Sequence, residues 1–151
     1  MNIKKMENNK RFGVGILAWI FNPDFSKILL LKRNKEKREK YGFDWGGIGG
    51  KLEFGEFSKD AILREIREEI GIKLDESKLK LLLVKEFPEF TKEVHGFSWF
   101  YSYILPENAK IRINEESDEY KWFDIKNLPD SMIDSKEDIL KILNIAREKF
   151  S

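Results

Sequence analysis

Three glutamates stand close together within one short segment of the chain. They are Glu65, Glu68 and Glu69, in the stretch SKDAILREIREEIG over residues 58–71. In an α-helix, at about 100° per residue, their side chains fall within one arc of roughly 100°, beside a separate apolar arc. Each close pair of like charges costs a few tenths of a kcal/mol. The pattern therefore predicts either a solvated acidic stripe or a site whose charge is neutralised by a divalent cation.

A glycine-rich segment precedes this predicted helix. Residues 46–50 read GGIGG, and glycine both adopts positive φ values and lets the backbone approach a ligand closely. Mg²⁺ takes carboxylate and carbonyl oxygens as ligands and bridges to phosphates. We therefore expect a Mg²⁺–phosphate site between the glycine segment and the glutamates. Arg64 and Arg67 are expected on the other side of the helix, where they would not neutralise the acidic face.

The composition excludes several other kinds of site. The 151 residues contain no Cys and a single His, which excludes disulfides, thiolate zinc sites, iron–sulfur clusters and cysteine nucleophiles. Any metal ion must then be held by oxygen atoms. Lys and Arg number 28 against 27 Asp and Glu, and this balance argues against a protein that binds duplex nucleic acid through a positive field. No apolar run approaches the ~20 residues of a membrane-spanning helix, so we expect a cytoplasmic protein with no membrane partner.

The elements that must position this site follow from the hydrophobic pattern. Helices are predicted over residues 58–70, with Ser58 as N-cap and Gly71 just past the end, and over residues 135–149. Strands are predicted over residues 12–21, 27–33, 78–87, 94–105, 111–113 and 120–124, with a charged loop over 34–40 and an acidic loop over 114–119. This mixture lacks strict βαβ alternation, which favours an α+β fold. Residues 1–10 are expected to form a flexible tail before a single domain over residues 11–151.

The glycine segment and the helix together match a known pattern. From Gly50 to Ile72 the sequence reads GKLEFGEFSKDAILREIREEIGI. It matches every fixed position of the Nudix box, namely Gly50, Glu56, Arg64, Glu65, Ile66, Glu68, Glu69, Gly71 and Ile72. The chain therefore resembles the Nudix (MutT-like) hydrolases. The resemblance implies the Nudix fold, an α/β/α sandwich with a mixed central β-sheet.

The resemblance also implies an activity and a set of metal ligands. Nudix enzymes hydrolyse a phosphoanhydride bond in a nucleoside diphosphate linked to another group, with Mg²⁺ or Mn²⁺ as cofactor. By resemblance, Glu68 and Glu69 are the principal metal ligands, and Glu65 is a further ligand or the residue that activates water. The carbonyl of Gly49 is an implied backbone ligand.

Other acidic and basic residues receive implied roles. Arg64 is expected to orient Glu65 and to pair with Glu56, which is the more structural acid. The family often takes another ligand or base from a loop before the last strand. Glu116 and Glu119 are the candidates here, and a solvated acidic turn is the alternative.

Candidate substrate contacts are less specific. Gly50 and Lys51 are the candidate substrate contacts of the glycine segment. Lys51 could reach a phosphate or could be an ordinary lysine at a strand edge. His95 could act as a base, or it could be a histidine at the end of a strand. Aromatic residues alternate onto one strand face and could stack on a nucleobase or pack in the core: Phe97, Trp99, Tyr101 and Tyr103.

Two features bear on the substrate. The sequence GGIGGK is similar to the form in members that hydrolyse oxidised purine nucleoside triphosphates, whereas Pro88 is close to the proline position of members that cleave ADP-ribose. We expect the substrate to be a nucleoside triphosphate, normal or oxidised, that is hydrolysed to a nucleoside monophosphate and pyrophosphate. The alternatives are ADP-ribose or another nucleotide sugar, a 5′ end of RNA, or a nucleotide sensor without turnover. The protein is expected to be a monomer or a homodimer.

Overall fold

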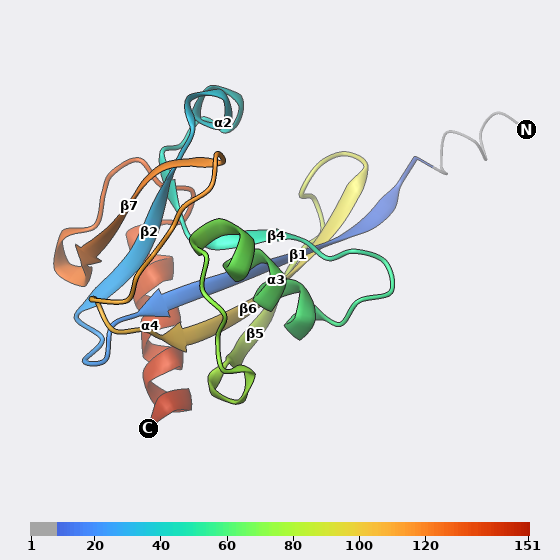
Figure 1. The fold of residues 1–151 in the computed structure, drawn as a ribbon. Helices are drawn as coiled ribbons and strands as arrows, with labels where there is room; N and C mark the ends of the chain where they lie inside the picture. The colour runs from blue at the N-terminus through green and yellow to red at the C-terminus, as the bar shows by residue number, and fades with distance from the viewer. Residues whose placement is uncertain (1–8) are drawn as a thin grey trace, which may run out of the picture.

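A computed structural model describes residues 9–151 of the chain, with a mixed β-sheet at its centre (Figure 1). Within these residues the sheet has seven strands: β1 (Arg11–Phe21), β2 (Lys27–Arg33), β3 (Trp45–Gly46), β4 (Ile48–Lys51), β5 (Lys80–Phe87), β6 (Val94–Ile104) and β7 (Ser117–Asp124). The α-helices are α2 (Lys35–Tyr41), α3 (Ser58–Ile70) and α4 (Lys136–Phe150), and the 3₁₀ helices are η1 (Glu76–Lys78) and η2 (Ile125–Asn127). Residues 1–8 of the predicted tail lie outside the described residues.

Strand β1 organises the sheet. It pairs in parallel with β6 along its whole length, and the other pairings in the sheet are antiparallel. On its second edge β1 pairs with β2 only at Ile20 and Phe21, and with β4 from Gly15 to Ala18. Two strands therefore share one edge of β1, and the glycine-rich β4 lies directly against the centre of the sheet.

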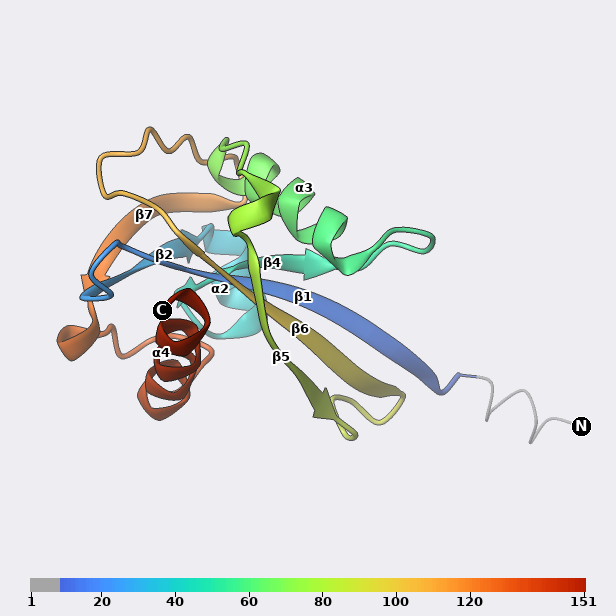
Figure 2. The ribbon, with the colours of Figure 1, turned by 90° about the horizontal axis from the view of Figure 1, so that it is seen from below.

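Helices cover both faces of the sheet (Figure 2). On one face, Ile16, Ala18 and Ile20 of β1 belong to a core cluster that includes the apolar side chains of α3. On the other face, Trp19 and Phe21 belong to a second cluster with the apolar side chains of α4. This division follows from the alternation of side chains along a strand. The α+β class and the α/β/α sandwich predicted from the sequence are confirmed.

Helix α3 has the predicted bounds, but its N-terminus differs from the prediction. Gly71 adopts the left-handed conformation with φ 70°, and its N–H donates to the carbonyl of Arg67. The N-cap position is Phe57, not Ser58, and no side chain caps the helix. The Ser58 hydroxyl instead lies 2.6 Å from the hydroxyl of Tyr101 on β6. This contact ties the first turn of α3 to the sheet.

Three other predictions were wrong. Residues 34–40 were expected to be a loop, but helix α2 forms there because Asn34 caps Lys37 N–H and Gly42 closes the C-terminus with φ 79°. Residues 111–113 form no strand, since they run beside the end of α3, where Arg112 N–H donates to Ile70 O. Strand β7 begins at residue 117, so the acidic loop is shorter than expected.

No helix in the described part of the chain is long and apolar enough to cross a membrane.

Candidate active site

Helix α3 turns its acidic arc toward strand β4. Its apolar arc packs on β1, so the neighbouring arc faces the glycine segment. The Glu69 side chain is 2% exposed, that of Glu65 is 13% exposed and that of Glu68 is 53% exposed. Buried carboxylates need partners because burial of an unpaired charge is costly. Two of the three glutamates therefore belong to the interior of a site and the third lies at its rim.

The glycines of β4 allow a very close approach between layers. A Cβ atom on Gly50 would lie 2.4 Å from Glu65 Oε1, and one on Gly49 would lie 2.5 Å from the carbonyl oxygen of Ile16. None of the glycines in residues 46–50 has a positive φ. The expectation that these glycines serve left-handed backbone is therefore wrong. They are required because β4 passes between β1 and the carboxylates of α3.

Both carboxylate oxygens of Glu69 have partners. Oε1 accepts a hydrogen bond from Arg33 Nη1 at 3.2 Å, and Oε2 accepts one from the N–H of Gly49 at 3.1 Å. The same guanidinium donates from Nη2 to the carbonyl of Gly47 at 2.8 Å. Arg33 was not among the predicted site residues. Its 36-residue separation from Glu69 gives no local spacing signal.

Arg64 links the other acids of the helix. Its Nη1 donates to Glu65 Oε1 at 2.9 Å and lies 3.7 Å from Glu68 Oε2, while its Nη2 donates to Glu56 Oε1 at 2.8 Å. The expectation that the acidic face has no internal counter-charge is wrong, because the long arginine side chain reaches across the helix surface. The contacts agree with the expected pairing of Arg64 with Glu56 and Glu65. The catalytic roles of these residues stay predictions.

The packing of carboxylates raises their pKa values. Burial raises the pKa of Glu69 to about 8, against the opposing effect of Arg33. Burial also raises the pKa of Glu65, and the charges of Glu68 and Glu116 act in the same direction. A group of like charges at short range is stabilised when a cation joins it. A cation bound among these carboxylates would favour their charged forms and so oppose the rise in their pKa values.

The acidic loop brings one of its two candidate glutamates to this site. Asn114 donates from Nδ2 to Glu68 O at 3.0 Å and accepts the N–H of Glu116 at 3.0 Å, so the loop docks on α3. Lys37 of α2 donates to Glu116 Oε1 at 2.7 Å and lowers the pKa of that carboxyl. Glu119 pairs with Lys32 in the sheet. The neighbouring residue Leu31 belongs to the core cluster on the α3 side, and side chains alternate along a strand, so Lys32 and Glu119 face the α4 side.

Lys51 also lies away from the carboxylates. It pairs with Gly15 and follows Gly50, whose Cβ position faces Glu65, so its side chain points to the opposite face of the sheet.

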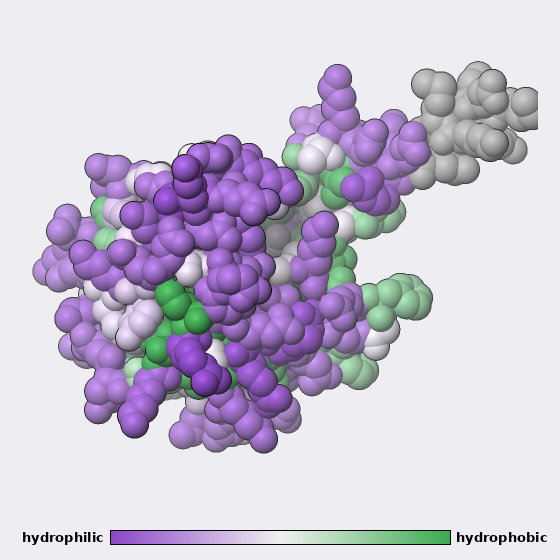
Figure 3. Space-filling model, turned by 45° about the horizontal axis from the view of Figure 1, so that its top comes forward, coloured by the Kyte–Doolittle hydropathy of each residue, from purple (hydrophilic) through white to green (hydrophobic). Residues whose placement is uncertain are grey.

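The surface seen in Figure 3 is mostly hydrophilic, with hydrophobic residues confined to small areas. The aromatic residues Trp99, Tyr101 and Tyr103 pack in the core beneath α3.

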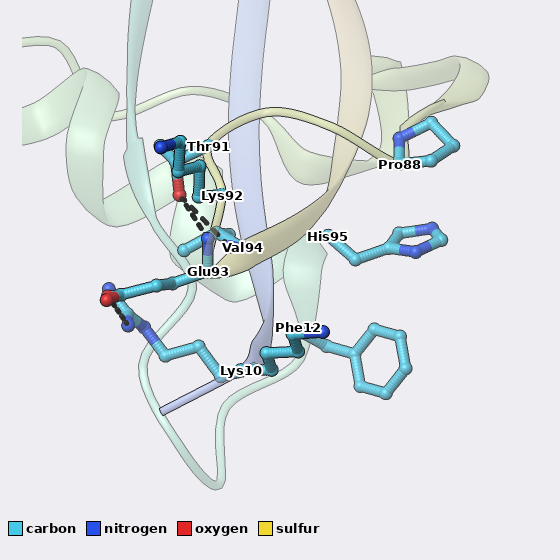
Figure 4. A pocket seen from close by; sticks show the side chains of 9 residues that line it. Lys10, Phe12, Pro88, Thr91, Lys92, Glu93, Val94 and His95 are labelled. Atoms are coloured by element: carbon cyan, nitrogen blue, oxygen red, sulfur yellow. Dashed lines mark hydrogen bonds and ion pairs between the residues drawn. The ribbon is translucent and has the colours of Figure 1, made fainter. Parts of the chain in front are cut away.

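A separate pocket contains His95, at the far end of β6. It has a volume of about 350 Å³, and the rings of His95 and Phe12 project to the same side (Figure 4). His95 Nε2 lies 2.6 Å from Glu86 Oε1, and its ring stacks on Phe97 with a centroid distance of 5.1 Å. Phe12 is four positions from Ile16, the partner of Gly50, which corresponds to about 13 Å along the strand. His95 therefore lies apart from the acidic site.

The donors of the acidic site suit a hard divalent cation. Across residues 9–151, no group of three or more Asp, Glu or His side chains is already arranged to hold a metal ion. Every candidate donor is an oxygen atom, which suits Mg²⁺ or Mn²⁺ rather than a soft metal. Glu65 and Glu68 both lie near the Arg64 guanidinium, at 2.9 Å and 3.7 Å, so both carboxylates already attract a positively charged group. The residues fit a divalent cation by donor type and by excess charge.

Comparisons with known proteins agree on one family. A family model described as the NUDIX domain matches residues 11–142. The chain is 29% identical, over an alignment of 157 positions, to an RNA pyrophosphohydrolase of Ruthia magnifica subsp. Calyptogena magnifica, which covers 88% of this chain and 80% of the relative. It is 31% identical over 123 positions to the dihydroneopterin triphosphate diphosphatase of Escherichia coli strain K12, covering 74% of this chain and 77% of the relative. A solved MutT NUDIX hydrolase from Burkholderia pseudomallei superposes with a TM-score of 0.70 and 27% identity, covering 87% of this chain and 98% of that one.

Proposed function

The chain belongs to the NUDIX domain family, and on that premise we propose that it is a metal-dependent pyrophosphohydrolase that converts a nucleoside triphosphate to a nucleoside monophosphate and pyrophosphate. The resemblance drawn from residues 50–72, and the Nudix fold that it implied, are confirmed. We further propose residues 11–151 as one catalytic domain. The observation that carries the proposal is the convergence of the α3 carboxylates on the glycines of β4.

Named residues supply the parts of such a reaction. Glu65, Glu68 and Glu69, with the Gly49 carbonyl and Glu116, are proposed to hold the cation. Bound Mg²⁺ or Mn²⁺ supplies charge neutralisation at the phosphoryl oxygens and a more acidic water. Glu65 lies against the Gly50 backbone, and it is proposed to take the proton from the attacking water.

Arg64 and Glu56 are proposed to orient the reacting carboxylate. The Arg64 guanidinium bridges Glu56 and Glu65, so both ends of the bridge are fixed by charge-assisted hydrogen bonds. Glu56 is held in turn by the N–H of Glu53 at 2.8 Å. A carboxylate oriented in this way loses little freedom when the substrate binds, and that lowers the entropic part of the barrier.

The names of the relatives favour a triphosphate. The E. coli relative is named for a triphosphate substrate, and the R. magnifica relative for RNA. The substrate panel therefore contains normal and oxidised deoxynucleoside triphosphates, dihydroneopterin triphosphate, 5′-triphosphate RNA and ADP-ribose. Release of pyrophosphate or of the nucleoside monophosphate is followed in Mg²⁺. Preferred cleavage of ADP-ribose, or no cleavage of any compound, would contradict the proposal.

The Glu68→Gln variant gives the sharpest test of the metal site. Its side chain is half exposed, so the substitution should leave the fold intact while it lowers turnover by orders of magnitude. Glu148→Gln is the matched control, since Glu148 is an exposed glutamate on α4, on the other face of the sheet. Turnover of Glu68→Gln equal to that of the control would contradict the metal assignment.

A further inference from the structure

Arg33 is a half-buried arginine at the end of β2. Its side chain is 13% exposed and that of its partner Glu69 is 2% exposed, which makes this the least exposed ion pair among the described residues. The guanidinium forks between two acceptors, Glu69 Oε1 on α3 and the Gly47 carbonyl beside β4. One side chain therefore connects three elements that the sequence separates widely.

The backbone beside β2 packs directly against this guanidinium. A Cβ atom on Gly46 would lie 3.4 Å from Arg33 Nη2, at ordinary contact distance, so the guanidinium lies against this glycine. The Arg33 N–H donates to the carbonyl of Asp44 at 2.8 Å, which fixes the end of β2 against the same segment. Glu69 completes the connection because its second oxygen holds the N–H of Gly49. The segment over residues 47–49 is thus held at Gly47 by Arg33 and at Gly49 by Glu69, and these two side chains are paired with each other.

These contacts leave Glu69 able to bind a further cation. Each carboxylate oxygen has two lone pairs, and each oxygen of Glu69 uses one hydrogen bond within the protein. Residues that hydrogen-bond a metal ligand fix its orientation. We propose that Arg33 is a positioning residue that orients Glu69 and the glycine segment for binding of the divalent cation. The inference rests on the proposed function for the presence of that cation.

Binding of Mn²⁺ alone tests the inference without any turnover. The wild-type protein and the variants Arg33→Lys and Arg33→Met are titrated with Mn²⁺, and free Mn²⁺ is measured by electron paramagnetic resonance. Removal of an outer partner of a metal ligand typically weakens affinity about 10- to 100-fold, and we expect a loss of this size in both variants. Lysine keeps the charge but not the planar fork, so it cannot bridge both acceptors.

A control separates positioning from loss of stability. Ile142→Ala removes a buried side chain of α4 on the other face of the sheet and should destabilise the fold. Its Mn²⁺ affinity should equal that of the wild type at a temperature where every variant is folded. A second readout is turnover by Arg33→Lys, where saturating Mn²⁺ should restore kcat while the Mn²⁺ concentration for half-maximal activity stays raised.

The outcomes distinguish failure of the inference about Arg33 from failure of the proposed function. Unchanged Mn²⁺ affinity in both Arg33 variants overturns the inference. Tighter binding also overturns it, because Arg33 would then compete with the cation. If Mn²⁺ affinity is weakened as much in Ile142→Ala as in the Arg33 variants, the effect comes from loss of stability alone, and the inference is again overturned. If the wild type binds Mn²⁺ but cleaves no compound of the panel, the proposed function fails while the Arg33 result stands. A wild-type protein that binds no Mn²⁺ overturns both.

Discussion

Because Gly50 lies against the Glu65 side chain, one methyl group added at Gly50 should lower activity without lowering stability. In Gly50→Ala the new Cβ would lie 2.4 Å from Glu65 Oε1, whereas ordinary contact begins at 3.4 Å. The carboxylate must therefore move by about 1 Å, and it can do so because it is the end of a flexible side chain. A misplacement of about 1 Å at a reacting group costs roughly 100-fold in rate. We expect kcat/KM to fall by about this factor with little change in stability.

Two neighbouring glycines supply the controls. In Gly49→Ala the Cβ would meet the backbone carbonyl of Ile16 at 2.5 Å, so β4 must separate from β1, and we expect a loss of about 1–3 kcal/mol in the free energy of unfolding. In Gly13→Ala the Cβ would meet only the side chain of Val94 at 2.9 Å, and the position lies at the far end of β1. Turnover of this variant should equal that of the wild type.

Two measurements check the reasoning. Steady-state pyrophosphate release at saturating Mg²⁺ gives kcat/KM, and urea unfolding gives the free energy of unfolding for each variant. Wild-type turnover in Gly50→Ala would show that the position of Glu65 does not limit the reaction. A loss of stability in Gly50→Ala as large as that in Gly49→Ala would show that the strain is not relieved by the side chain. Either result refutes the argument from the close contact.

Three further predictions concern pH, the helix end and the cation. Burial raises the pKa of Asp134 from its ordinary 3.8 to about 6, with Asp138 acting in the same direction, so the folded state loses stability as pH rises from about 4 to 6. Asp134→Asn should therefore be about 2 kcal/mol more stable than wild type at pH 7, allowing for partial exposure, and equal to it below pH 4, as urea unfolding would show; a gain independent of pH would contradict this. Gly71→Ala forces φ 70° on a residue with a Cβ and should lower the free energy of unfolding by about 1–2 kcal/mol in the same assay; an unchanged value would be inconsistent with that strain. EDTA should abolish hydrolysis, and added Mg²⁺ or Mn²⁺ should restore it; activity that persists in EDTA would contradict a metal-dependent site.

Helix α3 was predictable because its information is local. The apolar arc, the acidic arc and Gly71 all lie within one short segment, so spacing alone indicates the helix and its end. Helix α2 was missed because its sequence, KEKREKY, has no apolar periodicity. Its cap residues Asn34 and Gly42 could have indicated the helix, but its ion pairs are formed with distant residues, namely Glu116 just before β7 and Asp118 within it.

The counter-charges of the site were not predictable in the same way. Arg64 lies beside Glu65 in the sequence, yet only its rotamer decides that it reaches both Glu56 and Glu65. Arg33 meets Glu69 through the arrangement of β2, β4 and α3, which no spacing rule gives. The same holds for Glu119, whose position on the opposite face depends on where β7 begins and on its register with β2.

The parallel pairing of β1 with β6 has a consequence for how the protein acquires activity. Arg11 pairs with Val94, so the residues that pair between these two strands lie 83 positions apart in the chain. Pairings between such distant segments form slowly, because a long loop must close before the contact stabilises it. The carboxylate helix is therefore synthesised, and can turn helical, before β6 pairs with β1 and completes the sheet beneath it. The return of activity during refolding should accordingly lag behind the return of helical signal, which makes turnover a reporter of the last stage of folding.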